Sequence, residues 1–290
     1  MNFGHLDTLI AVIDEGSFDG AASALGISPS AVSQRIKNLE LSAGRVLLRR
    51  TSPPTATEAG EILVQTARRR RLLEAEATAQ LEGQALTMPL SVVVNADSLG
   101  TWFSAIFRDA SAGRHTGLRI WIEDERHSLA TLKRGDCLGV VTTEARAVPG
   151  CDSEYLGVQR YRPVGSPGLA ADLREGRYGW ADLPAVRFGS KDLMEAPVLA
   201  AHLGERGPAA GRVVSHVPSF EGINQAVAAG LGWAMIPEVT AEEWIGRGAM
   251  DLLSDDVLDV PLYWQHWRVE SQVVERLGDA IHAAAAVGLR

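Results

Sequence analysis

The spacing of apolar residues predicts three short helices at the N-terminal end of the chain. Residues 5–15 carry apolar side chains at intervals of three and four, which is typical of a helix with one buried face. Ser17 is suited to cap a second helix, and Gly26 follows its last apolar position, where glycine commonly ends a helix. After the turn residue Ile27, Ser28 and Pro29 suit the cap and first position of a third helix.

The third helix has two chemically different faces. Val32, Ile36 and Leu39 form its apolar stripe. The opposite face carries hydrogen-bonding and cationic side chains, and a basic hairpin follows: Ser30, Ser33, Gln34, Lys37 and, at the edge, Arg35, then Arg45, Arg49, Arg50, Thr51, Pro53 and Pro54. An ordinary helical hairpin shares the first part of this pattern. The whole favours a winged helix-turn-helix whose third helix lies in a DNA major groove.

The charge of the chain is unevenly distributed. The formal net charge of -8, taken alone, argues against a nucleic-acid partner. Residues 27–71 nevertheless hold nine Lys and Arg against three Glu, a local balance of +6. This asymmetry predicts one DNA-facing end on an otherwise acidic protein.

A long helix is predicted to follow the hairpin, from Thr57 to about Leu81. Its 25 or so residues would span roughly 37 Å at ~1.5 Å per residue. Its apolar seam is uneven and consists of Ile62, Thr66, Leu73 and Ala77. Such a helix either packs on its own domain or pairs with a second copy of the chain. The arginines of residues 68–71, which interrupt the seam, are expected to form a solvated face that adds general attraction to DNA.

From Leu90 onward, strands alternate with helices. Strands are expected at 90–94, 118–123 and 138–142, with helices at 100–110 and 127–134. A second unit of the same kind is expected from about residue 160, with strands at 160–166, 185–189, 212–217 and 233–237. The chain then returns through a strand at 261–267 and a helix at 271–286. Alternation of this kind predicts two α/β lobes built on parallel sheets.

Two stretches carry a resemblance to a known family. The run AASALGISPSAVSQRIKNLE followed by LLRRTSPPTATEAGE resembles the DNA-binding domain of LysR-type transcriptional regulators, and the chain has that family's length and layout. NADSLGTWF at 95–103 and YWQHWRVES at 263–271 resemble the subgroup that regulates export of basic amino acids, the LysG/ArgP type. The resemblance implies an activator of a lysine or arginine exporter gene; the alternative is a regulator, activating or repressing, that answers another metabolite.

The resemblance also implies a domain organisation. It places a winged helix-turn-helix at 3–59, a linker helix for dimerisation at 60–83 and a periplasmic-binding-protein-like α/β effector domain at 89–290. Lobe I of that domain would comprise 89–160 and 263–290, and lobe II 161–262. The expected partners are double-stranded operator DNA, RNA polymerase and a small-molecule effector, which the resemblance implies to be lysine or arginine. The chain itself is expected to form a homodimer or homotetramer.

In this interpretation the DNA contacts fall into two groups. Pro29, Ser30, Ser33 and Gln34, next to Ser28 at the helix start, would meet base edges, because they lie on the polar face of the third helix. The remaining residues would hold phosphates: Arg35, Lys37, Arg49, Arg50 and Thr51.

The effector is expected at the carboxyl ends of the strands, where open α/β sheets bind ligands. The turns there carry hydroxyls and carboxylates: Asp97, Ser98, Thr101, Asp124, Glu125, Thr142, Thr143, Ser219 and Glu221. Hydroxyls at helix starts can hold an α-carboxylate, and carboxylates can bind the ammonium groups of a basic amino acid. Each of these residues alone could instead be a helix cap. Trp102, Trp233, Trp264 and Trp267 are expected in the core.

Other classes of protein are disfavoured. Nucleophile-elbow, zinc-protease, P-loop and dinucleotide motifs are missing and the seven histidines are scattered, so we expect no enzyme, metal or cofactor. A solute-binding protein would share the lobes but would need a signal peptide, whereas the N-terminus reads as an amphipathic helix. With no run of eighteen apolar residues and two cysteines in no metal-binding spacing, we expect a cytoplasmic protein with reduced thiols and no membrane contact.

Overall fold

The structure is a computed structural model that describes residues 2–82, 88–108, 117–123, 125–204 and 207–290, without the side chains of 125–127. The N-terminal unit contains α1 (Phe3–Asp14), α2 (Phe18–Leu25), α3 (Pro29–Ala43) and a hairpin of β1 (Leu48–Arg49) and β2 (Thr55–Ala56). Ser17 Oγ accepts a hydrogen bond from Gly20 N–H at 2.9 Å, and Ser28 Oγ accepts one from Ala31 N–H at 3.2 Å. Both caps confirm the predicted helix starts.

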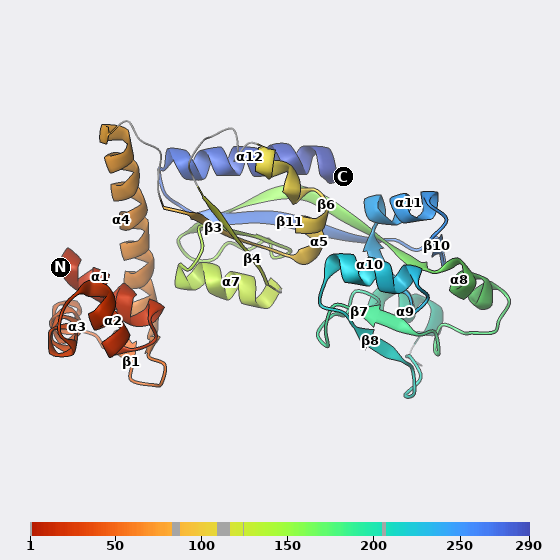
Figure 1. The fold of residues 1–290 in the computed structure, drawn as a ribbon, viewed down its shortest axis with the longest axis horizontal. Coiled ribbons are helices and arrows are strands. Elements are labelled where there is room, and N and C mark those ends of the chain that lie inside the picture. Colours follow the sequence, from red (N-terminus) through yellow and green to blue (C-terminus); the bar gives the residue numbers. More distant parts are fainter. Residues whose placement is uncertain (1, 83–87, 109–116, 124, 205–206) are drawn as a thin grey trace.

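Helix α4 (Glu58–Glu82) begins where the wing ends, and Gly60 makes the close approach possible. A Cβ at Gly60 would overlap the carbonyl oxygen of Leu47, so a larger residue could not pack α4 against the base of the wing. Val64 and Ala67 complete the core of the N-terminal unit, whereas Leu72 belongs to the core of the effector domain. One helix therefore contributes to both cores. It lies between the N-terminal helices and the effector domain (Figure 1).

The predicted seam of α4 is not the face that packs on this chain. Its four residues, Ile62, Thr66, Leu73 and Ala77, are all exposed. The prediction of a solvated arginine face is wrong: the side chains of Arg68 and Arg70 are 13% and 19% exposed and form ion pairs with carboxylates of α1. The arginines fold back because α1 presents acidic groups to this side of α4.

The effector domain is built on a seven-stranded sheet with the order β10-β6-β11-β5-β3-β4, and β9 also pairs with β6. The strands are β3 (Leu90–Val94), β4 (Leu118–Ile122), β5 (Gly139–Thr142), β6 (Cys151–Gly165), β9 (Ala234–Pro237), β10 (Asp251–Leu252) and β11 (Leu258–Trp267). Only the β3–β4 and β3–β5 pairs are parallel within this described sheet. The predicted parallel pairing therefore holds around β3, whereas the other pairs of this sheet are antiparallel and differ from the prediction.

Strands β6 and β11 cause the difference. They pair antiparallel from Leu258↔Tyr161 to Trp267↔Cys151, with a bulge after Leu262, and run continuously through both lobes. The predicted strands at 160–166 and 261–267 capture only part of each. The predicted division between lobes, at 160/161 and 262/263, falls inside these two strands.

Helices cover the sheet and complete the second lobe. α12 (Gln272–Gly288) lies on one face of the lobe I sheet and α7 (Glu125–Arg134) on the other (Figure 1). Lobe II adds the parallel pair β7 (Ala185–Arg187) and β8 (Val214–His216), together with α8 (Pro167–Arg174), α9 (Ala196–Leu203), α10 (Phe220–Ala228) and α11 (Glu238–Gly246). In the described part of the chain, no helix is long and apolar enough to cross a membrane.

The helix predicted at 100–110 is only partly confirmed, because residues 106–108 are helical but 101–105 are not part of an α-helix. Asn95 caps α5 (Ala96–Gly100) by accepting a hydrogen bond from Ser98 N–H, so the helix begins earlier than predicted. It ends at Thr101, whose backbone leaves the helical region, and a 3-10 turn η1 (Phe103–Ala105) follows; residues 109 and 110 lie outside the described residues. The four tryptophans expected in the core are all buried.

Candidate effector cleft and nucleic-acid interface

The predicted DNA-binding residues lie on α3 and the wing, and all but Arg35 are exposed. Arg35 is half-buried and points its guanidinium toward Thr8 Oγ1 at 3.5 Å. Gln34 Nε2 donates to Asn38 Oδ1 at 2.9 Å, and Thr51 Oγ1 donates to the carbonyl of Pro53 at 2.7 Å. The outer face of α3 is therefore covered by amide and hydroxyl groups able to exchange their partners for DNA.

Asp97 is an acidic group of lobe I that interacts with strand β6 and with lobe II. It lies in α5 of lobe I, and Tyr161 Oη on the crossover strand β6 donates to its Oδ2 at 2.9 Å. The pKa of Asp97 is raised to about 6, chiefly by burial and also by the nearby charge of Asp192, against the lowering effect of the Tyr161 hydrogen bond. A carboxylate with this pKa is poorly compensated and favours a cation beside it.

Asp192 approaches from lobe II, in the loop between β7 and α9. Its Oδ2 accepts from Phe188 N–H at 2.9 Å and its Oδ1 accepts from Met194 N–H at 3.0 Å. These hydrogen bonds fix the carboxylate in place. Two half-buried carboxylates, one from each lobe, are thus close enough for their charges to interact.

The neighbouring hydroxyls are tied into a buried network. Ser98, which is fully buried, donates from Oγ to Gln159 Oε1 at 3.2 Å. Gln159 Nε2 donates to Thr101 Oγ1 at 3.3 Å, and Thr101 Oγ1 donates to the carbonyl of Asp97 at 2.6 Å. This network attaches α5 to β6, so it holds Asp97 in position.

The two lobes meet at α5 and α10. A Cβ at Gly100 would overlap the ring of Phe220, so the glycine allows this contact. At the start of α10, Ser219 Oγ accepts from Gly222 N–H at 3.1 Å. Glu221 is exposed and accepts from Gln225 Nε2 at 3.2 Å.

The other predicted effector residues lie on lobe I. Thr142 is buried at the end of β5, and its Oγ1 accepts from Glu144 N–H at 3.2 Å. Thr143, next to it, is half-buried. Asp124 and the side chain of Glu125 lie outside the described residues.

Comparison with known proteins decides the family. Residues 3–61 match the bacterial regulatory helix-turn-helix protein, lysR family, and residues 83–286 match the LysR substrate binding domain. The chain belongs to the LysR family. Membership confirms that it is a regulator rather than an enzyme, and that the two-lobed unit is this family's effector-domain fold.

Full-length relatives resemble this LysR-family chain throughout. The lysine export transcriptional regulatory protein LysG of Corynebacterium glutamicum is 48% identical over 291 residues, covering 100% of both chains. The structure of full-length C. glutamicum LysG with bound effector Arg has a TM-score of 0.88 and covers 100% of both chains. The crystal structure of ArgP from Mycobacterium tuberculosis, 38% identical, has a TM-score of 0.90 and covers 99% of this chain and 98% of that one.

Sequence reasoning missed three groups around Asp97 in this LysR-family protein. Gln159 and Tyr161 lie in the part of β6 whose two-lobe path was not predicted. Asp192 lies in a loop, and its pairing with backbone N–H groups resembles an ordinary turn. The RYRPVGS segment, with Tyr161 two residues before Pro163, carried no signal that the tyrosine faces Asp97.

Proposed function

We propose that this protein is a transcriptional regulator that binds a basic amino acid, lysine or arginine, between its effector lobes and activates an exporter gene. The pair of Asp97 and Asp192 carries the proposal, because a basic amino acid brings two cationic groups and the pair offers one carboxylate from each lobe. The names of the full-length relatives, a lysine export regulator and a structure with bound Arg, support the same chemistry.

A cation held by both lobes would favour the arrangement in which they are close. Only a ligand that interacts more strongly with one arrangement can shift the equilibrium between arrangements. Asp97 and Asp192 repel each other when both are ionised, and a cation between them removes that repulsion. We place the α-carboxylate at the start of α10 beside Ser219, where backbone N–H groups favour an anion, and we retain Ser98, Thr101, Asp124, Glu125, Thr142, Thr143 and Glu221 as proposed lining residues.

The assembly and its partners form part of the proposal. The exposed stripe on α4, which contains Ile62 and Leu73, supports dimerisation through this helix and a tetramer of paired dimers. The course of α4, and of β6 and β11 through both lobes, supports a division into a DNA-binding domain at 3–59, a linker helix at 60–83 and an effector domain at 89–290. We propose that the protein acts in the cytoplasm on a partly palindromic operator and contacts RNA polymerase there.

A thermal-shift screen of the purified protein against the twenty amino acids and common carboxylates tests the effector. A ligand that binds the folded state raises the melting temperature by mass action. Stabilisation by lysine or arginine alone is expected. A response confined to an anion, such as an aromatic carboxylate, would refute the cationic cleft while leaving a regulator of another metabolite.

The DNA contacts predict two different kinds of mutant. Arg49→Ala is expected to weaken binding to all sequences and to reduce the salt dependence of the binding constant by about one counterion, because it removes a phosphate contact. Gln34→Ala is expected to relax sequence preference by about 1–3 kcal/mol at one base pair. Titrations at several salt concentrations on matched and mismatched duplexes separate the two; a change of sequence preference alone in Arg49→Ala would contradict the assignment.

A further inference from the structure

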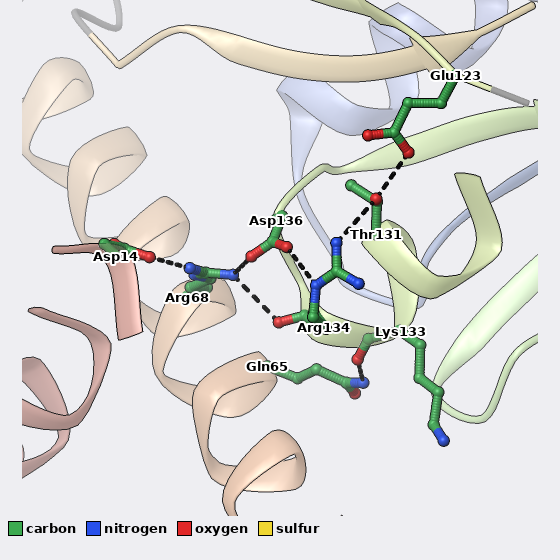
Figure 2. Close-up of polar contacts among 8 residues, drawn as sticks. All are labelled: Asp14, Gln65, Arg68, Glu123, Thr131, Lys133, Arg134 and Asp136. Atoms are coloured by element: carbon green, nitrogen blue, oxygen red, sulfur yellow. Dashed lines mark hydrogen bonds and ion pairs between the residues drawn. The ribbon is translucent and has the colours of Figure 1, made fainter. Parts of the chain in front are cut away.

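Arg68 joins three parts of the molecule at one guanidinium. From α4, its Nη2 pairs with Asp14 Oδ1 at the end of α1, and its Nη1 pairs with Asp136 Oδ1 in the turn between α7 and β5 (Figure 2). The same Nη1 donates to the carbonyl of Arg134 at 3.1 Å. The side chain of Arg68 is only 13% exposed, so solvent screens these pairs less than pairs on an open surface.

A row of polar contacts continues from Asp136 along α7. Arg134 Nε donates to Asp136 Oδ2 at 2.8 Å, and Arg134 Nη2 donates to Thr131 Oγ1 at 3.1 Å. Thr131, which is buried, donates from Oγ1 to Glu123 Oε2 at 2.8 Å (Figure 2). Glu123 directly follows β4, at the carboxyl edge of the sheet where the effector is expected.

The contacts between α4 and this turn of α7 are specific. Gln65 Nε2 donates to the carbonyl of Lys133, and Lys133 Nζ lies 3.6 Å from Glu61 Oε2. A guanidinium is a rigid planar fork, so it holds two carboxylates only when both keep their positions. A displacement of the turn relative to α1 must therefore break one of the Arg68 pairs.

We propose that Arg68 is a positioning residue through which the occupied or empty state of the effector cleft is transmitted to α1 of the same chain. The polar contacts from Glu123 to Asp136 determine the position of the Asp136 carboxylate, which pairs with Arg68. Because Arg68 also pairs with Asp14, a shift of Asp136 changes the position of α1, which packs against α2 and α3. The proposal rests on the proposed function, because it takes the effector to bind at the carboxyl edge of the sheet, where Glu123 lies.

Arg70 provides a matched control on the same helix. It pairs with Asp7 at 2.6 Å and Glu74 at 2.9 Å and lies over the ring of Phe3, all within α1 and α4. Arg68→Gln and Arg70→Gln each remove one positive charge from the same part of the molecule. Their effects on general attraction to DNA should therefore be similar, and a difference between them reports on the contact with α7.

Hydrogen exchange of the full-length protein without effector tests the three-way contact. Arg68→Gln is expected to speed exchange both in residues 3–14 and in residues 128–136. Arg70→Gln is expected to do so in 3–14 and to leave 128–136 unchanged. If Arg68→Gln leaves 128–136 unchanged, Arg68 does not hold this turn and the proposal is overturned, whatever the effector is.

The transmission itself is tested with L-arginine as the probe and a duplex that the wild-type protein selects from a random pool. Melting temperatures should show that wild type and both variants are stabilised by L-arginine. L-arginine is expected to change the DNA dissociation constant and bend angle of the wild type, and coupled sites typically change affinity by about 5–150-fold. This change should persist in Arg70→Gln. In Arg68→Gln, L-arginine should change the dissociation constant by less than about twofold. Asp136→Asn should reproduce the loss of the L-arginine effect on DNA binding. The double variant Arg68→Gln with Asp136→Asn should show no larger loss than either single variant.

Each remaining outcome is decisive. An unchanged response in Arg68→Gln overturns the proposal, as does a wild-type protein that binds L-arginine without any change in its DNA complex. A wild-type protein that is stabilised by L-lysine but not by L-arginine is tested in the same way with L-lysine. A wild-type protein that is stabilised by neither overturns the proposed function instead, and the exchange result then judges Arg68 separately.

Discussion

Glu195→Ala is expected to lower the free energy of unfolding of the effector domain by about 3–5 kcal/mol. Glu195 accepts hydrogen bonds from Arg187 Nε at 2.9 Å and from both Nη atoms of Arg212 at 2.8 Å. The side chain of Arg212 is 3% exposed and lies over the ring of Trp233. Without the carboxylate, Arg212 would remain as a buried and uncompensated charge, which is why the cost far exceeds that of an exposed pair.

Urea unfolding followed by tryptophan fluorescence measures this effect. Glu243→Ala is the control, because Glu243 pairs with Arg247 one helical turn away and both side chains are more than half exposed. Its removal is expected to cost less than about 1 kcal/mol. Equal effects of the two substitutions would show that the buried pair contributes no more than a surface pair.

The same carboxylate gives stability a definite dependence on pH. Burial alone would raise the pKa of Glu195, but hydrogen bonds and charges from Arg212 and Arg187 outweigh it and hold the pKa below the ordinary glutamate value. A lowered folded-state pKa contributes stability that is present above the unfolded pKa and is lost as pH falls through the folded one. Acid should therefore destabilise the wild type more than Glu195→Ala.

Asp97→Asn is expected to weaken binding of L-arginine by about 10–100-fold, the value of one hydrogen bond to a charged group. The amide has the size of the carboxylate and can still accept from Tyr161, so the fold should persist. Isothermal titration calorimetry measures the change. Asp259→Asn, at an exposed ion pair with Arg160, is the control and should bind normally; unchanged affinity in Asp97→Asn would remove Asp97 from the site.

The pH dependence of binding gives a second test of Asp97. Because its pKa is about 6, the carboxylate is largely ionised at neutral pH and becomes protonated as pH falls through 6. Affinity for the cation should fall over this range in the wild type and stay flat in Asp97→Asn. The sign for stability is opposite to that of Glu195: a raised folded-state pKa contributes stability below the unfolded pKa that is lost as pH rises through about 6.

Local chemistry explains which parts of the fold could be predicted from sequence. Ser17, Gly26 and Ser28 define helix ends through hydrogen bonds to residues within one turn, so the N-terminal unit followed from the sequence. The first half of β6 did not, because its partners in β11 lie over a hundred positions away and two of its residues, Glu154 and Tyr155, are exposed. Nothing local distinguishes such a segment from a loop.

The candidate site divides in the same way. Asp97 was found because acidic residues after a strand and at a helix start have a recognisable position. Asp192 was missed because its proximity to Asp97 depends on how lobe II folds back. The role of Arg68 could not be read from four consecutive arginines, since only the packing of α1 and α7 around α4 separates its partners from those of Arg70.

The position of β11 has a consequence for biosynthesis. The core of the DNA-binding unit is formed by residues 6–67, so it is complete when the ribosome has made less than a quarter of the 290 residues. The sheet that senses the effector needs residues 258–267 between β5 and β6. Domains fold in the order of their synthesis. A polypeptide released early would therefore carry a finished DNA-reading unit joined to a sheet with two unpaired inner edges, which are prone to aggregate.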